Sequence, residues 1–189
     1  MIPCVVLDTE TTGFPSDKGG FTARIIEVGA VVITADARVV SPISFLVKQP
    51  AKHLDSWQAK RAMKVHGIAA AKILKEGLEA NVAAPRFAQW FSKVQQRHGV
   101  RHIRAYSQAF DFWFLERPPW NLLERTGLEF GEDIKETAKR AMKASSGPSL
   151  KAAVAFANKG SGNFPWLSDA HRAEEDARMA AVMAIFFAQ

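Results

Sequence analysis

Two carboxylates that stand two residues apart, Asp8 and Glu10, end an apolar run near the N-terminus. If this run is a β-strand, its side-chain period of two places both carboxylates on one face. Converging carboxylates repel each other unless a cation lies between them, and hard divalent cations prefer oxygen ligands. A D-x-E triplet is expected about half a time by chance in this composition, but acidic residues are disfavoured in strands. The pair therefore predicts a divalent-metal site.

A third carboxylate, Asp111, stands alone in the aromatic stretch QAFDFWFL. Phe110 and Phe114 are spaced to share a helical face that packs into the core, which leaves Asp111 on a neighbouring face in the first helical turn. For Phe112 and Trp113 we favour packing over stacking on a nucleobase. The alternative for Asp111 is an acid stabilised by the N-terminal end of the helix dipole.

The C-terminal segment HRAEED adds a histidine and a carboxylate, His171 and Asp176. Residues five apart lie about 140° around a helix, so the two cannot share a helical face. His171 must then lie in the first frayed turn or the preceding loop, from which it reaches a site that Asp176 approaches from the helix. The alternative is a charged, solvated helix start, to which Glu174 and Glu175 belong.

The elements that position these residues follow from the hydrophobic pattern. Runs rich in β-branched residues and bounded by turn formers predict three consecutive strands in the N-terminal quarter, and two further strands later. The five predicted strands are Pro3–Thr9, Arg24–Thr34, Val39–Gln49, His102–Ser107 and Glu129–Ile134.

The remaining pattern is helical. Phe87, Trp90, Phe91 and Val94 recur at i, i+3, i+4 and i+7, the spacing of an apolar stripe that packs on the core. Further helices are predicted over Ala109–Glu116, over Ser149–Asn158 with Gly160 at its end, and over Ser168–Phe187 with Ser168 or Asp169 as N-cap. Strands followed by helices indicate an α/β domain with a mixed sheet.

Size and composition indicate one folded globular domain over residues 1–189. The chain has 189 residues, 48% of them hydrophobic and 23% charged, as in average globular proteins. Its longest apolar run, Met179–Ala188, has ten residues, against roughly 20 for a membrane-spanning helix. The single cysteine, Cys4, permits neither a disulfide nor a cysteine-based zinc site within the chain, and fits a reducing cytoplasm.

The positive charge is concentrated in the middle third of the sequence. Residues 48–104 contain twelve basic and three acidic side chains, a net charge of +9, whereas the whole chain carries +6. A polyanion could dock there, and a solvated basic face that only confers solubility explains the charge equally well.

Taken in order, the D-x-E pair, the lone Asp of the F-D-x-x-F/L segment and the H-x4-D pair resemble the DEDDh family of 3′→5′ exonucleases. Segments that surround these residues resemble the proofreading subunit of bacterial replicative polymerases and its relatives. They are LDTETTG (7–13), RIIEVGA (24–30), VHGI (65–68) and HRAEEDA (171–177).

This resemblance implies an RNase H-like fold, with a five-stranded mixed sheet flanked by helices. It implies two Mg²⁺ or Mn²⁺ ions, about 3.5–4 Å apart, held by Asp8, Glu10, Asp111 and Asp176, with His171 as general base. We also expect contacts to the substrate at Thr11, Thr12, Arg61, His66 and Gln108.

Two segments depart from the family pattern. Ser107-Gln108-Ala109 stands where many relatives have His-Asn-Ala, and Glu136-Thr137 stands where an Asp-Thr or Asp-Ser often occurs. Gln108 could replace the missing amide at longer reach. For His66 the resemblance predicts a loop near the terminal nucleotide, and the equal alternative is a partly buried loop histidine that makes a backbone hydrogen bond.

The resulting hypothesis is an exonuclease that releases nucleoside monophosphates from the 3′ end of single-stranded or frayed DNA. The phosphates upstream of the scissile bond would lie along Lys60, Arg61 and Lys64. The alternatives are trimming of RNA and a non-catalytic polymerase accessory module. The chain ends at Gln189, directly after the last predicted helix, which favours a free-standing enzyme over a dedicated polymerase subunit, with recruitment by a polymerase or repair protein left open.

Overall fold

The computed structural model describes residues 1–15, 22–160 and 171–188. The strands are β1 (Cys4–Thr11), β2 (Ile25–Ile33), β3 (Val39–Leu46), β4 (His102–Ala105) and β5 (Glu129–Phe130). The helices are α1 (Ala51–Leu54), α2 (Trp57–His66), α3 (Ala70–Glu76), α4 (Ala80–His98), α5 (Gln108–Leu115), α6 (Leu122–Thr126), α7 (Ile134–Ala141), α8 (Leu150–Gly160) and α9 (Ala173–Phe186). No helix among these is long and apolar enough to cross a bilayer.

The strands form one mixed sheet in the order β3-β2-β1-β4-β5. β1, β2 and β3 pair antiparallel, whereas β4 pairs parallel to β1 and β5 parallel to β4. The predicted five-stranded mixed sheet of an RNase H-like α/β fold is confirmed.

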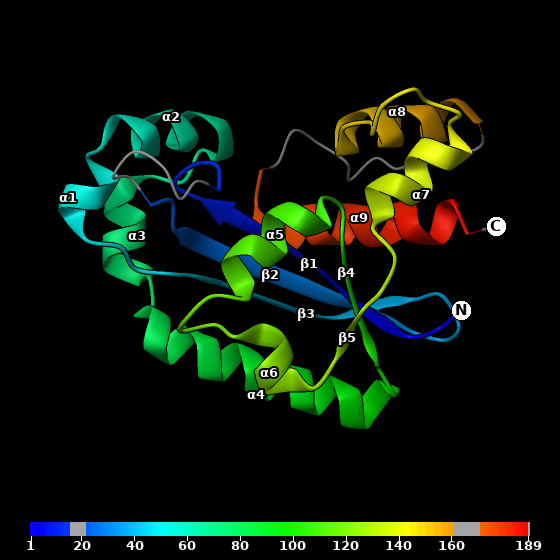
Figure 1. Ribbon diagram of the computed structural model, residues 1–189, viewed down its shortest axis with the longest axis horizontal. Helices are drawn as coiled ribbons and strands as arrows, with labels where there is room; N and C mark the ends of the chain where they lie inside the picture. Colours follow the sequence, from blue (N-terminus) through cyan, green and yellow to red (C-terminus); the bar gives the residue numbers. More distant parts are fainter. Residues whose placement is uncertain (16–21, 161–170, 189) are drawn as a thin grey trace.

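Helices cover both faces of this sheet (Figure 1). Val5 and Leu7 of β1 pack in a core with the α4 residues Phe87 and Phe91, while their neighbour Val6 packs on the opposite face in a core that includes residues of α7, α8 and α9. Alternation along the strand explains this division. The predicted stripe on α4 is confirmed, since Phe87, Phe91 and Val94 are buried and Trp90 is partly buried.

Two of the predicted strands, β3 and β5, end earlier in the structure than the sequence suggested. β5 stops at Phe130 rather than at Ile134, because Asp133 caps α7 and Ile134 is its first residue. β3 ends at Leu46, and the side chain of Gln49 instead donates to the carbonyl of Ile25 at 2.7 Å.

The last helix also begins later than predicted. Arg172 occupies the N-cap position of α9, and His171 precedes the helix. The predicted caps Ser168 and Asp169 lie outside the described residues. The expectation that His171 belongs to the segment before the helix is confirmed.

Candidate active site

The ends of β1 and β4 bring the predicted acidic residues to one edge of the sheet. Asp8 and Glu10 lie on β1 with the same parity as Cys4 and Val6, so they continue the face that α9 covers. Asp111 lies in the first turn of α5, the helix that comes after β4. Because β1 and β4 are parallel neighbours, the start of α5 meets the end of β1.

Asp111 is fixed to β1 by two hydrogen bonds. Its Oδ1 accepts from the backbone N–H of Thr9 at 2.9 Å and from the Thr9 hydroxyl at 2.8 Å. Asp111 is 2% exposed, whereas the neighbouring Asp8 is half-buried. These hydrogen bonds hold the start of α5 against β1. The alternative interpretation, in which the helix dipole alone stabilises Asp111, therefore does not account for its position.

Asp176 and His171 come from the C-terminal part of the chain and lie next to Glu10. His171 Nδ1 lies 3.9 Å from Asp176 Oδ2, and the His171 side chain is 54% exposed. Glu10, His171 and Asp176 each offer one ligand atom, and these three atoms lie within 4.8 Å of one another. Residues more than 160 positions apart in sequence thus form one cluster.

An ion pair between the partly exposed Arg172 and the buried Glu27 positions the start of α9. Arg172 donates through Nε to both carboxylate oxygens of Glu27, at 3.1 and 3.0 Å, and Nη2 adds a further contact. The backbone N–H of Ala173 donates to Glu27 Oε2 at 3.1 Å. Glu27 is the register partner of Glu10 on β2 and is 1% exposed. The pair therefore fixes the residues on both sides of Arg172 beside Glu10.

Gly29 allows this close approach of helix to sheet. It is the register partner of Asp8. A Cβ atom at this position would lie 2.1 Å from the backbone N of Glu174 and 2.2 Å from the carbonyl carbon of Ala173. Only a residue without a side chain lets the first turn of α9 rest on β2 next to Asp8.

Sequence reasoning did not identify Glu27 and Arg172 as positioning residues. The available signal was a carboxylate in the otherwise apolar run IIEVGAVVI, where an unpaired charge would be costly. The partner could not be read, because it lies 145 residues away.

The four carboxylates predicted as metal ligands bind protons more tightly than usual. Burial raises the pKa of Glu10 to about 8, with repulsion from Asp176 and Glu27 adding to it and Arg172 opposing it. Burial also raises the pKa of Asp111 to about 7, against the opposing hydrogen bonds from Thr9. For Asp176 burial, then Glu175 and Glu27, raise the pKa to about 7. The pKa of Asp8 rises well above its ordinary value through burial and then repulsion from Asp111, Glu10 and Asp176.

This donor set fits divalent cations. Carboxylates that repel each other and resist ionisation gain stability when a hard cation replaces their protons. The cluster of Glu10, His171 and Asp176 identifies where ligand atoms converge among the described residues.

The predicted substrate residues Thr11 and Thr12 hold the turn after β1. The Thr11 hydroxyl donates to the carbonyl of Gly13 at 2.7 Å. The Thr12 hydroxyl accepts from the backbone N–H of Arg24 at 2.9 Å and lies 2.8 Å from His53 Nε2.

His66 is the last residue of α2 and is 5% exposed. Its Nδ1 accepts from the backbone N–H of Ile68 at 3.1 Å, the backbone hydrogen bond of the alternative interpretation, while Nε2 has no partner in the described part of the chain. Both interpretations placed His66 in a loop, which was wrong, because α2 continues to this residue and Gly67 ends the helix in the left-handed conformation. Burial lowers the pKa of His66 to about 4, with Glu27, His171 and Arg172 close enough to contribute. The end of α2 therefore lies beside the start of α9.

Asp133 connects Gln108 to the segment Glu136-Thr137, the second place where the sequence differs from the family pattern. Asp133 Oδ2 accepts from the backbone N–H of Gln108 at 3.0 Å, and its Oδ1 caps α7 through Lys135 N–H at 2.8 Å. The Gln108 side-chain oxygen is buried, with no hydrogen-bond partner in residues 1–15, 22–160 and 171–188.

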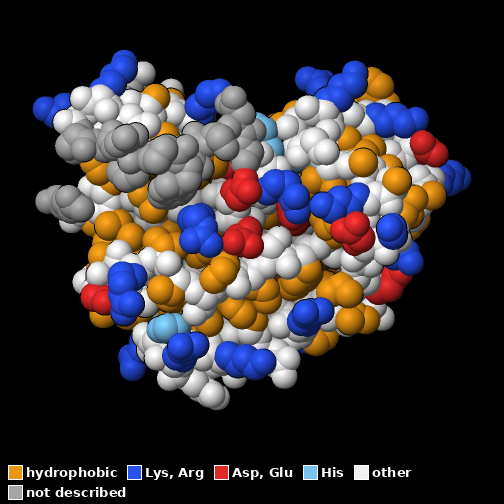
Figure 2. All heavy atoms as spheres, turned by 180° about the vertical axis from the view of Figure 1, so that it is seen from behind, with side chains coloured by type: hydrophobic (Ala, Val, Ile, Leu, Met, Phe, Trp, Pro, Cys, Tyr) orange, Lys and Arg blue, Asp and Glu red, His pale blue; other side chains and the backbone are white. Residues whose placement is uncertain are grey.

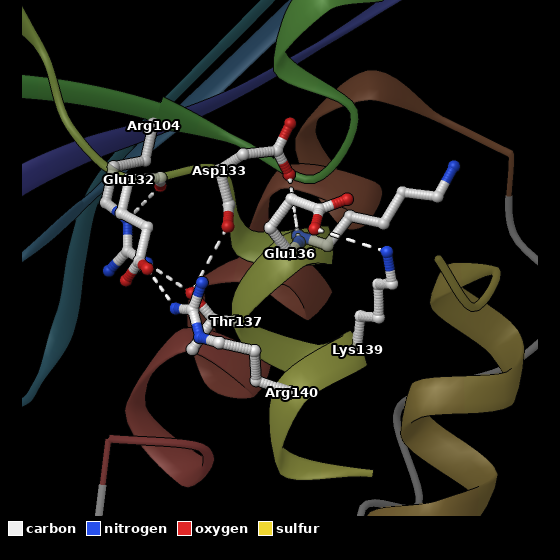
Figure 3. A network of polar contacts seen from close by, with 8 residues as sticks. Arg104, Glu132, Asp133, Glu136, Thr137, Lys139 and Arg140 are labelled. Carbon is white, nitrogen blue, oxygen red and sulfur yellow. Dashed lines mark hydrogen bonds and ion pairs between the residues drawn. The ribbon is translucent and has the colours of Figure 1, made fainter. Parts of the chain in front are cut away.

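Figure 3 shows the polar network around this cap. Glu136 pairs with Lys139 at 3.8 Å, and Thr137 accepts from Arg104 at 3.4 Å. Arg104 also donates to the carbonyl of Glu132 at 2.7 Å. Glu136 thus contacts its own helix α7, and Thr137 contacts β4.

Comparison with known proteins identifies related folds. A family model described as "Exonuclease" matches residues 5–184. The zinc-bound complex of E. coli exonuclease I with single-stranded DNA is similar, with a TM-score of 0.66 and 20% identity over 97% of this chain and 40% of that chain. A 3′-exonuclease that recognises the 3′ end of a histone mRNA stem-loop has a TM-score of 0.68 and 12% identity, over 97% and 80% of the two chains.

Exonuclease I of Methylocaldum szegediense gives a TM-score of 0.66 at 21% identity, covering 96% of this chain and 39% of that chain. This chain therefore spans about two fifths of the exonuclease I chains that it matches. A search of curated proteins finds no match.

Proposed function

Because the chain belongs to the exonuclease family, we propose that it hydrolyses the last phosphodiester at the 3′ end of single-stranded or frayed DNA and releases nucleoside 5′-monophosphates. The observation that carries this proposal is the convergence of Asp8, Glu10, Asp111 and Asp176 with His171 at one sheet edge. The similar fold of E. coli exonuclease I, which binds zinc and single-stranded DNA in its complex, supports it.

Asp8, Glu10, Asp111 and Asp176 would hold two divalent cations, Mg²⁺ or Mn²⁺. When bound, such ions lower the pKa of a water ligand and stabilise the departing oxygen. His171, exposed and next to Asp176, takes the proton of the attacking water. The water oxygen bonds to phosphorus, the bond from phosphorus to the 3′ oxygen breaks, and that oxygen takes a proton from solvent.

RNA is the second candidate substrate. The RNA-recognising 3′-exonuclease is as similar in fold as the DNA-bound one. Discrimination requires a contact to the 2′-hydroxyl. Gln108 is a candidate for that contact, because it lies three residues before Asp111 on α5 and its side-chain oxygen has no hydrogen-bond partner among the described residues.

The test is an incubation with single-stranded DNA and RNA of one sequence, labelled at the 3′ or the 5′ end, with Mg²⁺ or with EDTA. We expect release of the 3′ label as a mononucleotide with Mg²⁺ only, and a ladder of shortened products from the 5′-labelled strand. Release of the 5′ label as a mononucleotide would contradict the direction. Strand binding without hydrolysis would favour a non-catalytic module.

Asp8→Ala is the matched variant for this assay. We expect it to fold and to lose hydrolysis, because the remaining carboxylates cannot hold both ions. Circular dichroism checks folding. A pure, folded variant with more than about a tenth of wild-type activity at saturating Mg²⁺ would sink the assignment of Asp8.

A further inference from the structure

An exposed stripe on α2 combines an aromatic ring with positive charge. Trp57, Arg61 and Val65 recur at i, i+4 and i+8, and Lys64 lies between the last two. At 100° per residue these four side chains span about 100° of the helix circumference, opposite the buried residues Ala59 and His66. The stripe therefore points away from the core.

Trp57 is 69% exposed and Val65 is 62% exposed. The Arg61 guanidinium carbon lies over the Trp57 ring, 5.5 Å from its centroid. Single exposed apolar side chains are common on protein surfaces. Here, however, a tryptophan, an arginine stacked on it and a further lysine share one face. In the described part of the chain, neither Arg61 nor Lys64 has an acidic partner within ion-pair distance.

The helix that carries this stripe ends beside the candidate active site. α2 ends at His66, which is near Glu27, His171 and Arg172. Trp57 stands nine residues earlier, which corresponds to about 13.5 Å along the helix axis. Because His66 and the stripe lie on opposite sides of α2, a strand whose 3′ end occupies the active site would have to pass around the end of the helix. At 3.4 Å per stacked nucleotide it would reach Trp57 no sooner than about four nucleotides from its 3′ end.

Building on the proposed function, we propose that Trp57 is a stacking platform for a nucleobase upstream of the scissile bond, with Arg61 and Lys64 on the neighbouring phosphates. Proteins that bind single strands without sequence preference combine aromatic rings, on which bases stack, with a basic path along the backbone. The absence of acidic side chains from WQAKRAMKVH gives the charge complementarity that a polyanion requires. Val65 adds apolar surface between the platform and the active site.

Two substrates separate this role from catalysis. The p-nitrophenyl ester of thymidine 5′-monophosphate occupies only the active site, whereas oligo(dT) also reaches Trp57. We expect Trp57→Ala to lower kcat/KM for oligo(dT) by about 5- to 150-fold, the range for loss of one stacked base, and to leave hydrolysis of the ester unchanged. Trp57→Phe should retain most of the oligo(dT) activity. Val82→Ala, which removes an exposed apolar side chain from α4, is the control without effect.

A scan with abasic sites locates the stacked base. In the wild type, an abasic site at one position, about four or more nucleotides from the 3′ end, should weaken binding, and Trp57→Ala should abolish this dependence, as expected for a direct pairwise contact. Equal losses on both substrates would show a structural role, and unchanged oligo(dT) kinetics would assign the stripe to another partner, such as a protein. Either result overturns the proposal.

If the wild type hydrolysed neither substrate, the proposed function would fail. Binding of the abasic series measured by fluorescence anisotropy would then still decide the role of Trp57, because binding does not require turnover.

Discussion

The role of His171 differs in kind from that of the carboxylates around it. Its side chain is half exposed and contacts Asp176 at 3.9 Å, so it can face both the cluster and solvent. Two roles fit this position, because His171 also belongs to the group of side chains that could ligate a metal ion. A base moves a proton during the reaction, whereas a ligand changes metal affinity.

His171→Ala separates these roles. If His171 is the general base, the single-turnover rate should fall by about 10²–10⁴ while the half-saturating Mg²⁺ concentration changes little. A general base works only in its proton-free form, so the wild-type rate should rise with pH, and this rise should vanish in the variant. The measurement is single-turnover kinetics from pH 5.5 to 9 with a Mg²⁺ titration. A variant that regains the wild-type rate at high Mg²⁺ would be evidence for a ligand.

At the scale of elements, the approach of α9 to β2 decides the geometry of the site. Gly29 lies under the first turn of this helix, next to Asp8 in the sheet register. Asp176 and His171 reach Asp8 and Glu10 only if that contact is kept.

Gly29→Ala should therefore displace the start of α9. We expect a loss of about 1–3 kcal/mol in stability, the usual cost of overpacking, and a larger proportional loss of activity than of folded protein. Urea unfolding and single-turnover rates measure both. Gly160→Ala is the matched control, because a Cβ there meets nothing within 4 Å. An active Gly29→Ala variant of normal stability would contradict this account of how α9 is placed.

Strands and long helices were predictable from the sequence because their patterns are periodic and local. β-branched runs gave β1 to β3, and the stripe of Phe87, Phe91 and Val94 gave α4. The short helices α1, α2, α3, α6 and α7 were not predicted one by one, since four to ten residues hold too few apolar positions to establish a period.

The same distinction holds for the site. Asp8 and Glu10 follow from the period of one strand, whereas the contact of Glu27 with Arg172 depends on strand register and on packing across 145 residues. Neither register nor packing is visible locally. The predicted start of α9 was wrong for a related reason. Arg172, the N-cap residue, makes no side-chain hydrogen bond to its own helix and is held instead by its hydrogen bond to Glu27 on β2.

At the scale of the whole molecule, the basic middle third of the sequence does not form one surface. α2 ends beside the candidate site, whereas α4 packs on the opposite face of the sheet, away from α9. In Figure 2 lysines and arginines are spread over the face shown, with carboxylates among them. Of the basic segment expected from the sequence to bind a polyanion, the residues of α2 therefore lie near the candidate site and those of α4 do not.

Two double variants, one on α2 and one on α4, test whether only the basic residues of α2 bind the strand. Arg61→Glu with Lys64→Glu should weaken single-strand binding and flatten its salt dependence by about 1.4 in the slope of log K against log salt, for two phosphate contacts. Arg86→Glu with Lys93→Glu on α4 changes the net charge equally and should leave the slope unchanged. Titrations by fluorescence anisotropy from 50 to 300 mM salt provide the measurement. Equal effects of both double variants would mean that only net charge matters.

Crowding of carboxylates also predicts how the whole protein responds to pH and metal. The pKa values of Glu10, Asp111 and Asp176 are raised to about 8, 7 and 7 in the folded protein, against about 4 in an unfolded chain. A carboxyl group with a raised pKa binds its proton more tightly when folded. It therefore stabilises the metal-free protein at low pH, and this contribution is lost as pH rises from about 4 to 8.

Bound Mg²⁺ should reverse this loss, because the cation takes the place of the protons. We expect the melting temperature in EDTA to fall from pH 5 to pH 8, and the increase caused by Mg²⁺ to grow over the same interval. At a hundredfold excess of Mg²⁺ over its Kd the gain is about 2.7 kcal/mol, or about 5–11 °C for a chain of this size. His66, whose pKa is lowered to about 4, affects both samples alike and cancels in the difference. Asp8→Asn should raise stability in EDTA at pH 8 and shrink the Mg²⁺ effect, whereas a Mg²⁺ effect that is constant with pH or largest at pH 5 would refute the carboxylate cluster as the metal site.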